Sequence, residues 1–293
     1  MSTHYIDPDF DKRIIVPPGA EPQPRSIPIP PPPGCTCRYG YPVFSYPGGK
    51  ARLSRPICEL APPSGKVFCD VFAGRGNVTW AAMTLLGYES YWINAVGTDK
   101  FYYGIWQRSR YADDLGRERS KEFYDEMKAL ALSQHVKPTR AALMEAFLTF
   151  SGGTFEDAGF RSSGGGATRA GYEHKVHHAC ALLCVLEHRI TAMDYKDALA
   201  ELSSDDFAYI DPPYKDAKVK SFSDKTLDHR ELVAILLDAP FRWILSEYEH
   251  PVYGPLTEKF GKPMRIEVQK VMDNSNYTQG KRKKVVECLW KNF

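Results

Sequence analysis

The segment 65–99 constrains the fold of this chain more than any other stretch. It opens with GKVFCDVFAGRGN, in which an apolar run from Val67 to Phe72 leads into a bend with two glycines. The apolar segment VTWAAMTLL follows with helical character, and YWINAVGTD then predicts a second strand that ends on Asp99. Strand, helix and strand in this order are typical of a parallel sheet in an α/β protein.

The rest of the pattern extends this sheet and interrupts it once. Strands are predicted at RITAMDY, FAYID and FRWILSEY, a helix from about Asp228 to Leu237, and two closing strands around a basic loop near the end. The pattern between them is mostly helical, with a long glycine- and serine-rich loop at 151–175. We therefore expect a proline-rich arm at 1–38, a sheet domain at 39–100 and 189–293, and a helical insert at 101–188.

Composition argues against several broad classes of protein. The 293 residues are 43% hydrophobic and 25% charged, no segment approaches a membrane span, and the start of the chain has no signal pattern. We expect a cytoplasmic protein, and the seven cysteines agree because they contain no Cys-x-x-Cys pair. The formal net charge of +2 is too small to indicate a nucleic-acid partner by itself.

A histidine- and cysteine-rich stretch allows two interpretations. HKVHHACALLCVLEH places Cys180, Cys184 and His188 on one helical face, with His177 nearby. Such a set can bind zinc, but a buried face of small apolar cysteines with a satisfied histidine is the commoner outcome. We therefore predict no metal site here.

Acidic residues follow several of the predicted strands. In an open parallel sheet, ligands bind beyond the carboxyl ends of the strands, so these acids are expected to converge on one crevice. They are Asp70, Asp99, Asp194 and Asp211. Asp99 is placed to accept hydrogen bonds from the two hydroxyls of a ribose, and capping the next helix is its alternative role.

The glycine bend and the stretch YIDPPY carry the most specific chemistry. Gly74 and Gly76 let a ligand approach the backbone, but no G-x-G-x-x-G pattern forms, which favours a nucleotide-like ligand without a pyrophosphate. The FAYI strand ends on Asp211, two prolines and Tyr214. A plain turn explains this ending as well, because proline cannot donate to a sheet ladder.

Five motifs in order resemble one enzyme family. FSYPGGK, DVFAGRGN, TD and DPPY look like motif X, motif I, the ribose acid and motif IV of the Dam-like, alpha-group N6-adenine-specific DNA methyltransferases. NSNYTQGKRKKVVECL is similar to that family's C-terminal stretch, in which a basic run precedes Lys-Val-x-Glu-x-Leu. The resemblance covers roughly residues 43–293. It implies a Rossmann-like S-adenosylmethionine-dependent methyltransferase sheet with a mostly helical target-recognition insert, which methylates N6 of an adenine flipped out of duplex DNA.

The resemblance also implies roles for the matching residues. Asp211 and the Pro212 carbonyl accept hydrogen bonds from the adenine amino group, Pro213 helps to stiffen the loop, and Tyr214 stacks on the base. Lys50 pairs with the methionine carboxylate of the cofactor, and Asp194 lies near its adenine amino group. The full cofactor set is Tyr46, Lys50, Asp70, Phe72, Gly74, Gly76, Asp99, Asp194 and Asp211.

Basic residues in two places are predicted to contact DNA. Those in the insert loop are Arg161, Arg169 and Lys175, and those in the C-terminal run are Lys281, Arg282 and Lys283. The insert lacks a clear counterpart of the Asn-rich segment usual in enzymes that read GATC, so the target sequence is left open. The expected partner is double-stranded DNA, bound by a monomer or weak dimer near the nucleoid, with a restriction enzyme as a possible cognate.

Three other functions compete with this interpretation. The DPPY motif indicates a substrate with an amino group on its base but does not distinguish deoxyribose from ribose. Adenine in structured RNA is therefore the first alternative substrate. A catalytically silent nucleic-acid-binding module is the second, but it predicts erosion of the glycine bend or of DPPY, and neither is eroded. A metal-dependent nuclease is the weakest, because no Asp/Glu-x-Lys pair stands out.

Overall fold

The structure is a computed structural model that describes residues 37, 39–149, 152–161, 169–215, 227–270 and 283–293. All but the end of the predicted proline-rich arm lies outside these residues. So do Lys281, Arg282 and the middle of the glycine- and serine-rich loop.

The described strands form one sheet in the order β3-β2-β1-β4-β5-β7-β6. The first five strands of this order are parallel, and β7 runs antiparallel to both of its neighbours. The strands are β1 (Ser64–Asp70), β2 (Gly87–Asn94), β3 (His188–Thr191), β4 (Phe207–Ile210), β5 (Arg242–Glu247), β6 (Met264–Lys270) and β7 (Lys283–Lys291).

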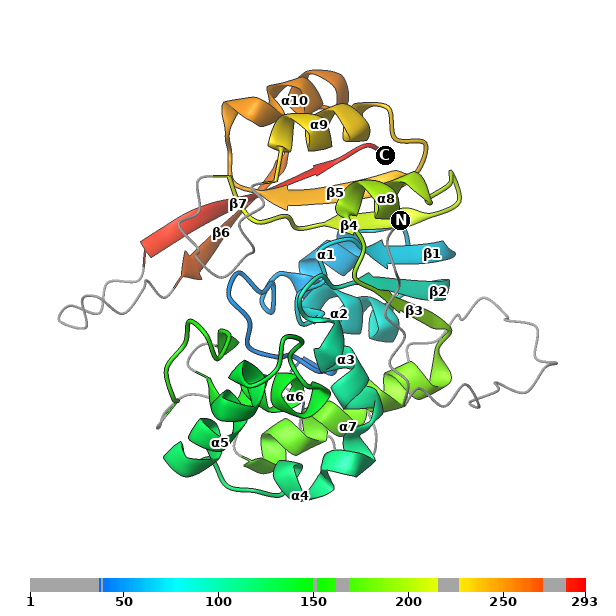
Figure 1. Cartoon of the computed structure of the whole chain (residues 1–293). Helices are drawn as coiled ribbons and strands as arrows, with labels where there is room; N and C mark the ends of the chain where they lie inside the picture. Colours follow the sequence, from blue (N-terminus) through cyan, green and yellow to red (C-terminus); the bar gives the residue numbers. More distant parts are fainter. Residues whose placement is uncertain (1–36, 38, 150–151, 162–168, 216–226, 271–282) are drawn as a thin grey trace.

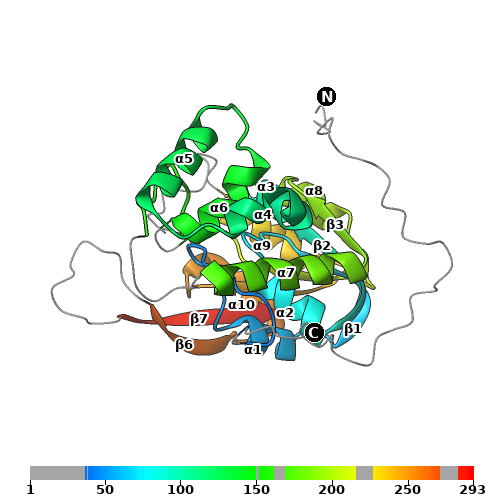
Figure 2. The same ribbon diagram turned by 90° about the horizontal axis from the view of Figure 1, so that it is seen from below.

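Helices cover both faces of the sheet (Figure 1). One face carries α1 (Ser54–Leu60), α2 (Asn77–Leu85), α3 (Asp99–Trp106), α6 (Thr139–Leu148) and α7 (Arg169–Val185), with α4 (Ala112–Leu115) and α5 (Lys121–Leu132) farther out. The other face carries α8 (Tyr195–Ala200), α9 (His229–Leu237) and α10 (Gly254–Phe260). In Figure 2 the long helix α7 crosses the first face, and α5 lies beyond α6.

Side-chain alternation along the strands produces these two cores. On β1, Phe68 packs with the helices of the first face, and its neighbour Cys69 packs with those of the second. On β4, Tyr209 and Ile210 divide in the same way. Because successive side chains on a strand point to opposite faces, an apolar run with little alternation is what a strand covered on both faces requires.

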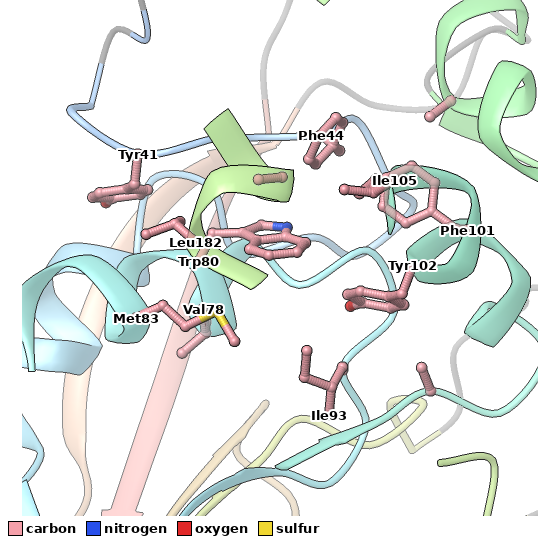
Figure 3. Packing of buried hydrophobic residues seen from close by; sticks show 14 of the residues in the cluster. Tyr41, Phe44, Val78, Trp80, Met83, Ile93, Phe101, Tyr102, Ile105 and Leu182 are labelled. Carbon is pink, nitrogen blue, oxygen red and sulfur yellow. The ribbon is translucent and has the colours of Figure 1, made fainter. Parts of the chain in front are cut away.

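Trp80 of α2 lies at the centre of the larger core (Figure 3). Its indole is fully buried and packs against Phe44 and Tyr102, with ring centroids 6.3 and 5.6 Å away. The indole Nε1 donates a hydrogen bond to the carbonyl oxygen of Arg75 at 2.9 Å. The core is therefore tied directly to the glycine bend, and the one polar atom of the indole is satisfied.

The predicted strands and helices are present, with shifts in their ends. β1 occupies Ser64–Asp70 instead of Val67–Phe72. β2 ends at Asn94 and not at Asp99, because Ala95–Thr98 forms a turn in which Gly97 has φ +75°. Residues 169–175 of the expected loop are helical instead, since α7 begins at Arg169.

The expected zinc-compatible helical face does not form. α7 ends at Val185, so His188 begins β3 instead of sharing a helix with Cys180 and Cys184. Within the described ranges, no group of three or more His, Cys, Asp or Glu side chains is arranged to hold a metal ion.

The described helices are also too short or too polar for any of them to cross a membrane.

Candidate active site

The site lies where the strand order reverses, between β1 and β4. From β1 the chain continues to β2 and β3 on one side of β1, whereas β4 and β5 lie on its other side. Asp70 is the last residue of β1 and pairs in register with Tyr209, two residues before Asp211. The two predicted acids therefore lie on neighbouring strands at the switch point, where α/β sheets bind their ligands.

Asp211 forms an ion pair with Lys50. The Lys50 ammonium donates to Asp211 Oδ1 at 2.6 Å and Oδ2 at 2.8 Å, and to the Gly48 carbonyl at 3.1 Å. The Lys50 side chain is 6% exposed and that of Asp211 is 16% exposed. Lys50 thus contacts the acid of DPPY, and its predicted contact with the methionine carboxylate stays a prediction.

Three contacts define the position of the Tyr214 ring. The Lys50 ammonium lies 4.6 Å from the ring centroid, and Tyr248 meets the ring edge-on at 4.5 Å between centroids. The Tyr214 hydroxyl donates a hydrogen bond to Glu287 Oε1. Burial, together with the negative charges of Asp211 and Glu287, raises the pKa of Tyr214, so the hydroxyl remains a donor at neutral pH.

Glu247, at the end of β5, holds the chain that follows DPPY. Its Oε1 accepts hydrogen bonds from the Lys215 backbone N–H at 2.7 Å and the Tyr253 hydroxyl at 3.0 Å, and its Oε2 accepts from the Tyr248 backbone N–H at 2.6 Å. Burial raises the pKa of Glu247 to about 7. Pro212, three residues before Lys215, is buried.

Asp70 has one satisfied carboxylate oxygen and one unsatisfied one. Oδ2 accepts a hydrogen bond from Thr79 Oγ1 at 2.6 Å, whereas the buried Oδ1 accepts none within the described residues. Burial, and also the charge of Asp211, raises the pKa of Asp70 to about 7. A buried acceptor without a partner is a site that fits a cationic donor from a ligand.

Both glycines of the bend are required by its geometry. Gly74 and Gly76 have φ of +53° and +73°. A Cβ on Gly74 would lie 2.6 Å from the ring of Tyr46, and one on Gly76 would lie 2.7 Å from the Tyr102 hydroxyl. The Gly74 carbonyl accepts from Thr98 Oγ1 at 2.7 Å, so the bend is tied to the start of α3.

Arg75, which was not among the predicted site residues, joins this bend to the helical insert. Its guanidinium is buried and donates to the carbonyls of Ser45 at 2.8 Å and Gly152 at 2.5 Å, and to Glu145 Oε2 at 3.0 Å. Glu145 also accepts from Lys137 Nζ at 2.6 Å. A glutamate within the apolar helix AALMEAFL was the available signal, because a buried carboxylate needs a partner.

The positions of the acids after β2 and β3, Asp99 and Asp194, differ from the predicted strand ends. Asp99 is the first residue of α3 and not a strand end, and Thr98 occupies the N-cap position that was the alternative for Asp99. Asp194 is exposed and caps α8 by accepting from the Lys196 backbone N–H at 3.0 Å. Asn94, also missed, ties neighbouring strand ends by donating to the carbonyls of Val71 and Met193 at 3.1 and 3.0 Å.

Two of the predicted DNA-binding residues lie together. Arg161 and Lys175 line a small pocket with Arg119, whose guanidinium lies 4.5 Å from the ring centroid of Phe147. Burial lowers the pKa of all three cations, and the charge of Arg161 lowers those of Arg119 and Lys175 further. Arg119 was missed in the sequence. The side chains of Arg169 and Lys283 are outside the described part of the structure.

Phe72, the remaining predicted cofactor residue, is half-buried after β1, and its ring centroid lies 5.7 Å from that of Tyr195. Tyr46 is half-buried against the glycine bend, and its ring centroid lies 5.5 Å from the Arg75 guanidinium. Burial raises the pKa of Tyr46 to about 12. The structure therefore brings Tyr46, Lys50, Asp70 and Asp211 within electrostatic reach of one another beside the ends of β1 and β4, whereas Asp194 is exposed at the start of α8.

The part of the chain that contains the glycine bend matches a known protein family. Residues 46–147, about a third of the chain, match the family described as D12 class N6 adenine-specific DNA methyltransferase. The predicted resemblance to the Dam-like enzymes is confirmed. The D12 match includes Lys50, the glycine bend, Arg75 and Glu145, and it ends before Asp211. The alpha-group assignment stays a prediction.

Two solved structures align with most of the chain at low similarity. One is a precorrin-8w decarboxylase from Methanobacterium thermoautotrophicum, at 12% identity over 83% of this chain and 89% of that one, with a TM-score of 0.33. The other is the putative methyltransferase yhhF from Escherichia coli, at 11% identity over 82% and 85%, with a TM-score of 0.33. No curated protein matches the chain in sequence. The strand order and the D12 match give the fold, an α/β Rossmann-like methyltransferase sheet, as predicted.

Proposed function

We propose that this chain is a site-specific DNA adenine N6-methyltransferase that transfers a methyl group directly from S-adenosylmethionine to a flipped adenine. The observation that carries the proposal is the position of Asp211 beside Asp70 at the switch point of a D12-type chain. In this proposal 39–100 and 189–293 form the catalytic domain, and 101–188 recognise the target. The oligomeric state and a cognate restriction enzyme stay predictions from the sequence.

The chemistry requires help for a weak nucleophile. The lone pair of the adenine N6 is delocalised into the ring, and hydrogen bonds accepted from both amino hydrogens favour a pyramidal nitrogen. The Asp211 carboxylate and the Pro212 carbonyl are the acceptors, and Tyr214 supplies a stacking face for the extruded base. Positive charge develops on N6 until it loses a proton, and a preorganised carboxylate stabilises that charge.

Lys50 and the entering base share the Asp211 carboxylate. Lys50 donates to both Asp211 oxygens, and each of these oxygens can accept a further hydrogen bond, so an amino hydrogen can bond beside Lys50. The Gly48 carbonyl and the Glu287 carboxylate, 3.1 and 3.6 Å from the ammonium, offer it alternative acceptors. Lys50 can therefore shift a short distance without losing all its partners.

The residues present fit the cofactor that supplies the methyl group. S-adenosylmethionine carries an ammonium, and the buried Oδ1 of Asp70 has no hydrogen-bond donor within the described residues. Asp70 would hold that ammonium, the backbone of Gly74 and Gly76 would lie against the methionine part, and Asp99 would accept from the ribose.

Cofactor affinity is expected to rise with pH and to level off above about pH 7. The pKa of Asp70 is raised to about 7, and a cationic donor binds its ionised form, so binding below this pH must displace a proton. The affinity for S-adenosylhomocysteine should fall by up to about tenfold per pH unit below pH 7. Calorimetric titration from pH 5.5 to 8.5 measures this effect. Asp70→Asn should flatten the profile, and an unchanged profile in that variant would argue against the pairing.

Arg161→Gln is expected to weaken DNA binding and its dependence on salt. Arg161, Arg119 and Lys175 line one pocket between the insert and residues 43–45. A lost phosphate contact lowers the slope of log K against log salt by about 0.9. Fluorescence anisotropy with a labelled duplex at several salt concentrations gives the slope. Arg189→Gln, an exposed arginine paired with Glu201, is the matched control. Equal slopes for wild type and Arg161→Gln would exclude a phosphate contact.

Labelled methyl transfer to matched substrates tests the proposed function. Unmethylated duplex DNA and structured RNA are incubated with the protein and labelled cofactor, and the product nucleoside is identified. We expect N6-methyladenine in DNA only. Label only in RNA would establish the alternative substrate, and no label in either would favour a silent nucleic-acid-binding module. Methylation mapping of the DNA then gives the target sequence.

A further inference from the structure

We propose that Glu287, in the C-terminal Lys-Val-x-Glu-x-Leu stretch, is a positioning residue that holds the ring of Tyr214 and balances the charge of Lys50. The inference rests on the proposed function and deepens it. The resemblance assigned this stretch no role in the reaction. The structure places its glutamate beside DPPY, although the two are separated by 73 residues in the sequence.

The antiparallel insertion of β7 accounts for this placement. β7 lies between β5 and β6, and its residues 288 and 289 pair with Glu247 and Ser246 of β5. Residue 287 therefore comes just beyond the carboxyl end of β5, at the edge of the sheet where DPPY begins. The Glu287 side chain is 1% exposed, so its charge depends on partners for compensation.

Among the described residues, Oε1 of Glu287 has three partners. Oε1 accepts hydrogen bonds from the Tyr214 hydroxyl and from Ser246 Oγ at 2.8 Å, and it lies 3.6 Å from the Lys50 ammonium. Ser246 is itself buried, so the carboxylate is fixed from the strand side. Glu287 thus links the sheet to a tyrosine and a lysine that both contact the proposed reaction site.

The link to the hydroxyl orients the Tyr214 ring. A tyrosine ring turns about two side-chain torsions. The anchored hydroxyl restricts the first, and because its oxygen lies on the axis of the second, that rotation is restricted by Tyr248, which packs against the ring. With Tyr248 in a T-shaped contact with the ring and Glu287 on its hydroxyl, the ring is held with Lys50 4.6 Å from its centroid. A stacking face that is already oriented costs less free energy of ordering when the base arrives.

The link to Lys50 adds a negative charge beside the Lys50–Asp211 pair. One ammonium neutralises one carboxylate, so the Lys50–Asp211 pair alone carries no net charge. Glu287 adds a second carboxylate to the same ammonium, and the group of three carries one negative charge. Because N6 becomes positive during methyl transfer, this surplus stabilises the transition state more than the ground state.

Two substitutions separate the two effects. Glu287→Gln keeps an oxygen acceptor for the Tyr214 hydroxyl and removes the charge, so we expect a lower kcat with a nearly unchanged KM for DNA. Glu287→Asp keeps the charge, but its side chain is one methylene shorter, so the carboxylate no longer reaches the Tyr214 hydroxyl. This variant should raise KM and lower kcat together. Each loss of kcat/KM is expected to be about 10- to 100-fold, the range for a hydrogen bond to a charged group.

A double-mutant cycle with Tyr214→Phe decides whether Glu287 acts through the hydroxyl. The phenylalanine keeps the ring, so Glu287→Asp combined with Tyr214→Phe should lower kcat/KM little more than the worse single change. Fluorescence of a duplex with 2-aminopurine at the mapped target adenine gives a second readout of base stacking. Glu267→Gln, an exposed carboxylate on neighbouring β6, is the control and should behave as wild type.

The outcomes distinguish the inference from the function on which it rests. A wild-type protein that methylates no adenine overturns the proposed function. If the wild type is active, wild-type kinetics for both Glu287 variants, or losses that add independently to that of Tyr214→Phe, overturn the positioning role. Thermal unfolding of each variant checks the fold, and loss of folding in both with a stable control would make Glu287 a structural residue only.

Discussion

Asp211→Asn is expected to lower kcat for adenine methylation by about 10²- to 10³-fold, the cost of losing one preorganised charge-stabilising group. The amide is the same size, but its charge is gone and one of its two terminal atoms becomes a donor. Lys50, which donates to both oxygens at 2.6 and 2.8 Å, would then face a donor. Initial rates of labelled methyl transfer at saturating DNA and cofactor measure the change.

The result should appear in kcat and kcat/KM alike, because the lost interaction strengthens as charge develops on N6. Asp238→Asn is the matched control, since its side chain is 91% exposed at the C-cap of α9. Methyl transfer by Asp211→Asn at the control's rate would show that this carboxylate is not the acceptor. A Kd for S-adenosylhomocysteine close to that of the wild type would place the loss in the reaction itself.

Arg75→Met is expected to lower the free energy of unfolding by about 3–5 kcal/mol, as when one partner of a buried ion pair is removed. The Arg75 guanidinium is 1% exposed, and its loss leaves the Glu145 carboxylate and two carbonyls without this donor. Methionine fills a similar length without restoring a hydrogen bond. Urea unfolding followed by circular dichroism gives the free energy and the m-value.

The control for Arg75→Met is Lys121→Met on α5. Lys121 pairs with Asp125, but both side chains are 56% exposed, and such pairs contribute about 0.3–0.5 kcal/mol. If the free energy of unfolding falls as little in Arg75→Met as in the control, water replaces the guanidinium between the glycine bend and the helical insert. A large loss would show that the glycine bend and the helical insert depend on one another for stability.

Local patterns were sufficient for the sheet strands and the helices beside them. The apolar run of β4 ends on Asp211 because the two prolines after it cannot donate to a ladder, and this reading needs no other part of the chain. The sequence likewise predicted a helix that begins near Asp228. Asp228 caps α9 by accepting hydrogen bonds from the backbone N–H groups of Arg230 and Glu231.

Local patterns failed where an apolar residue does not enter a core. Val96 reads as part of the second strand but is 62% exposed in a turn, which moved the predicted strand end to Asp99. The same limit affected His188, whose spacing suits a helix that stops at Val185. Burial depends on which elements pack nearby, and the pattern of one segment does not contain that information.

The fold class follows from the sequence, and so do the residues with distinctive backbone or chemical demands: two glycines in a bend, and an acid followed by two prolines. Which side chains meet depends instead on the tertiary fold. Lys50 and Asp211 are 161 residues apart, Tyr214 and Glu287 are 73 apart, and Arg75 and Glu145 are 70 apart. Contacts over such distances follow from strand order and helix packing, because folding brings the ends of separate strands to one edge of the sheet.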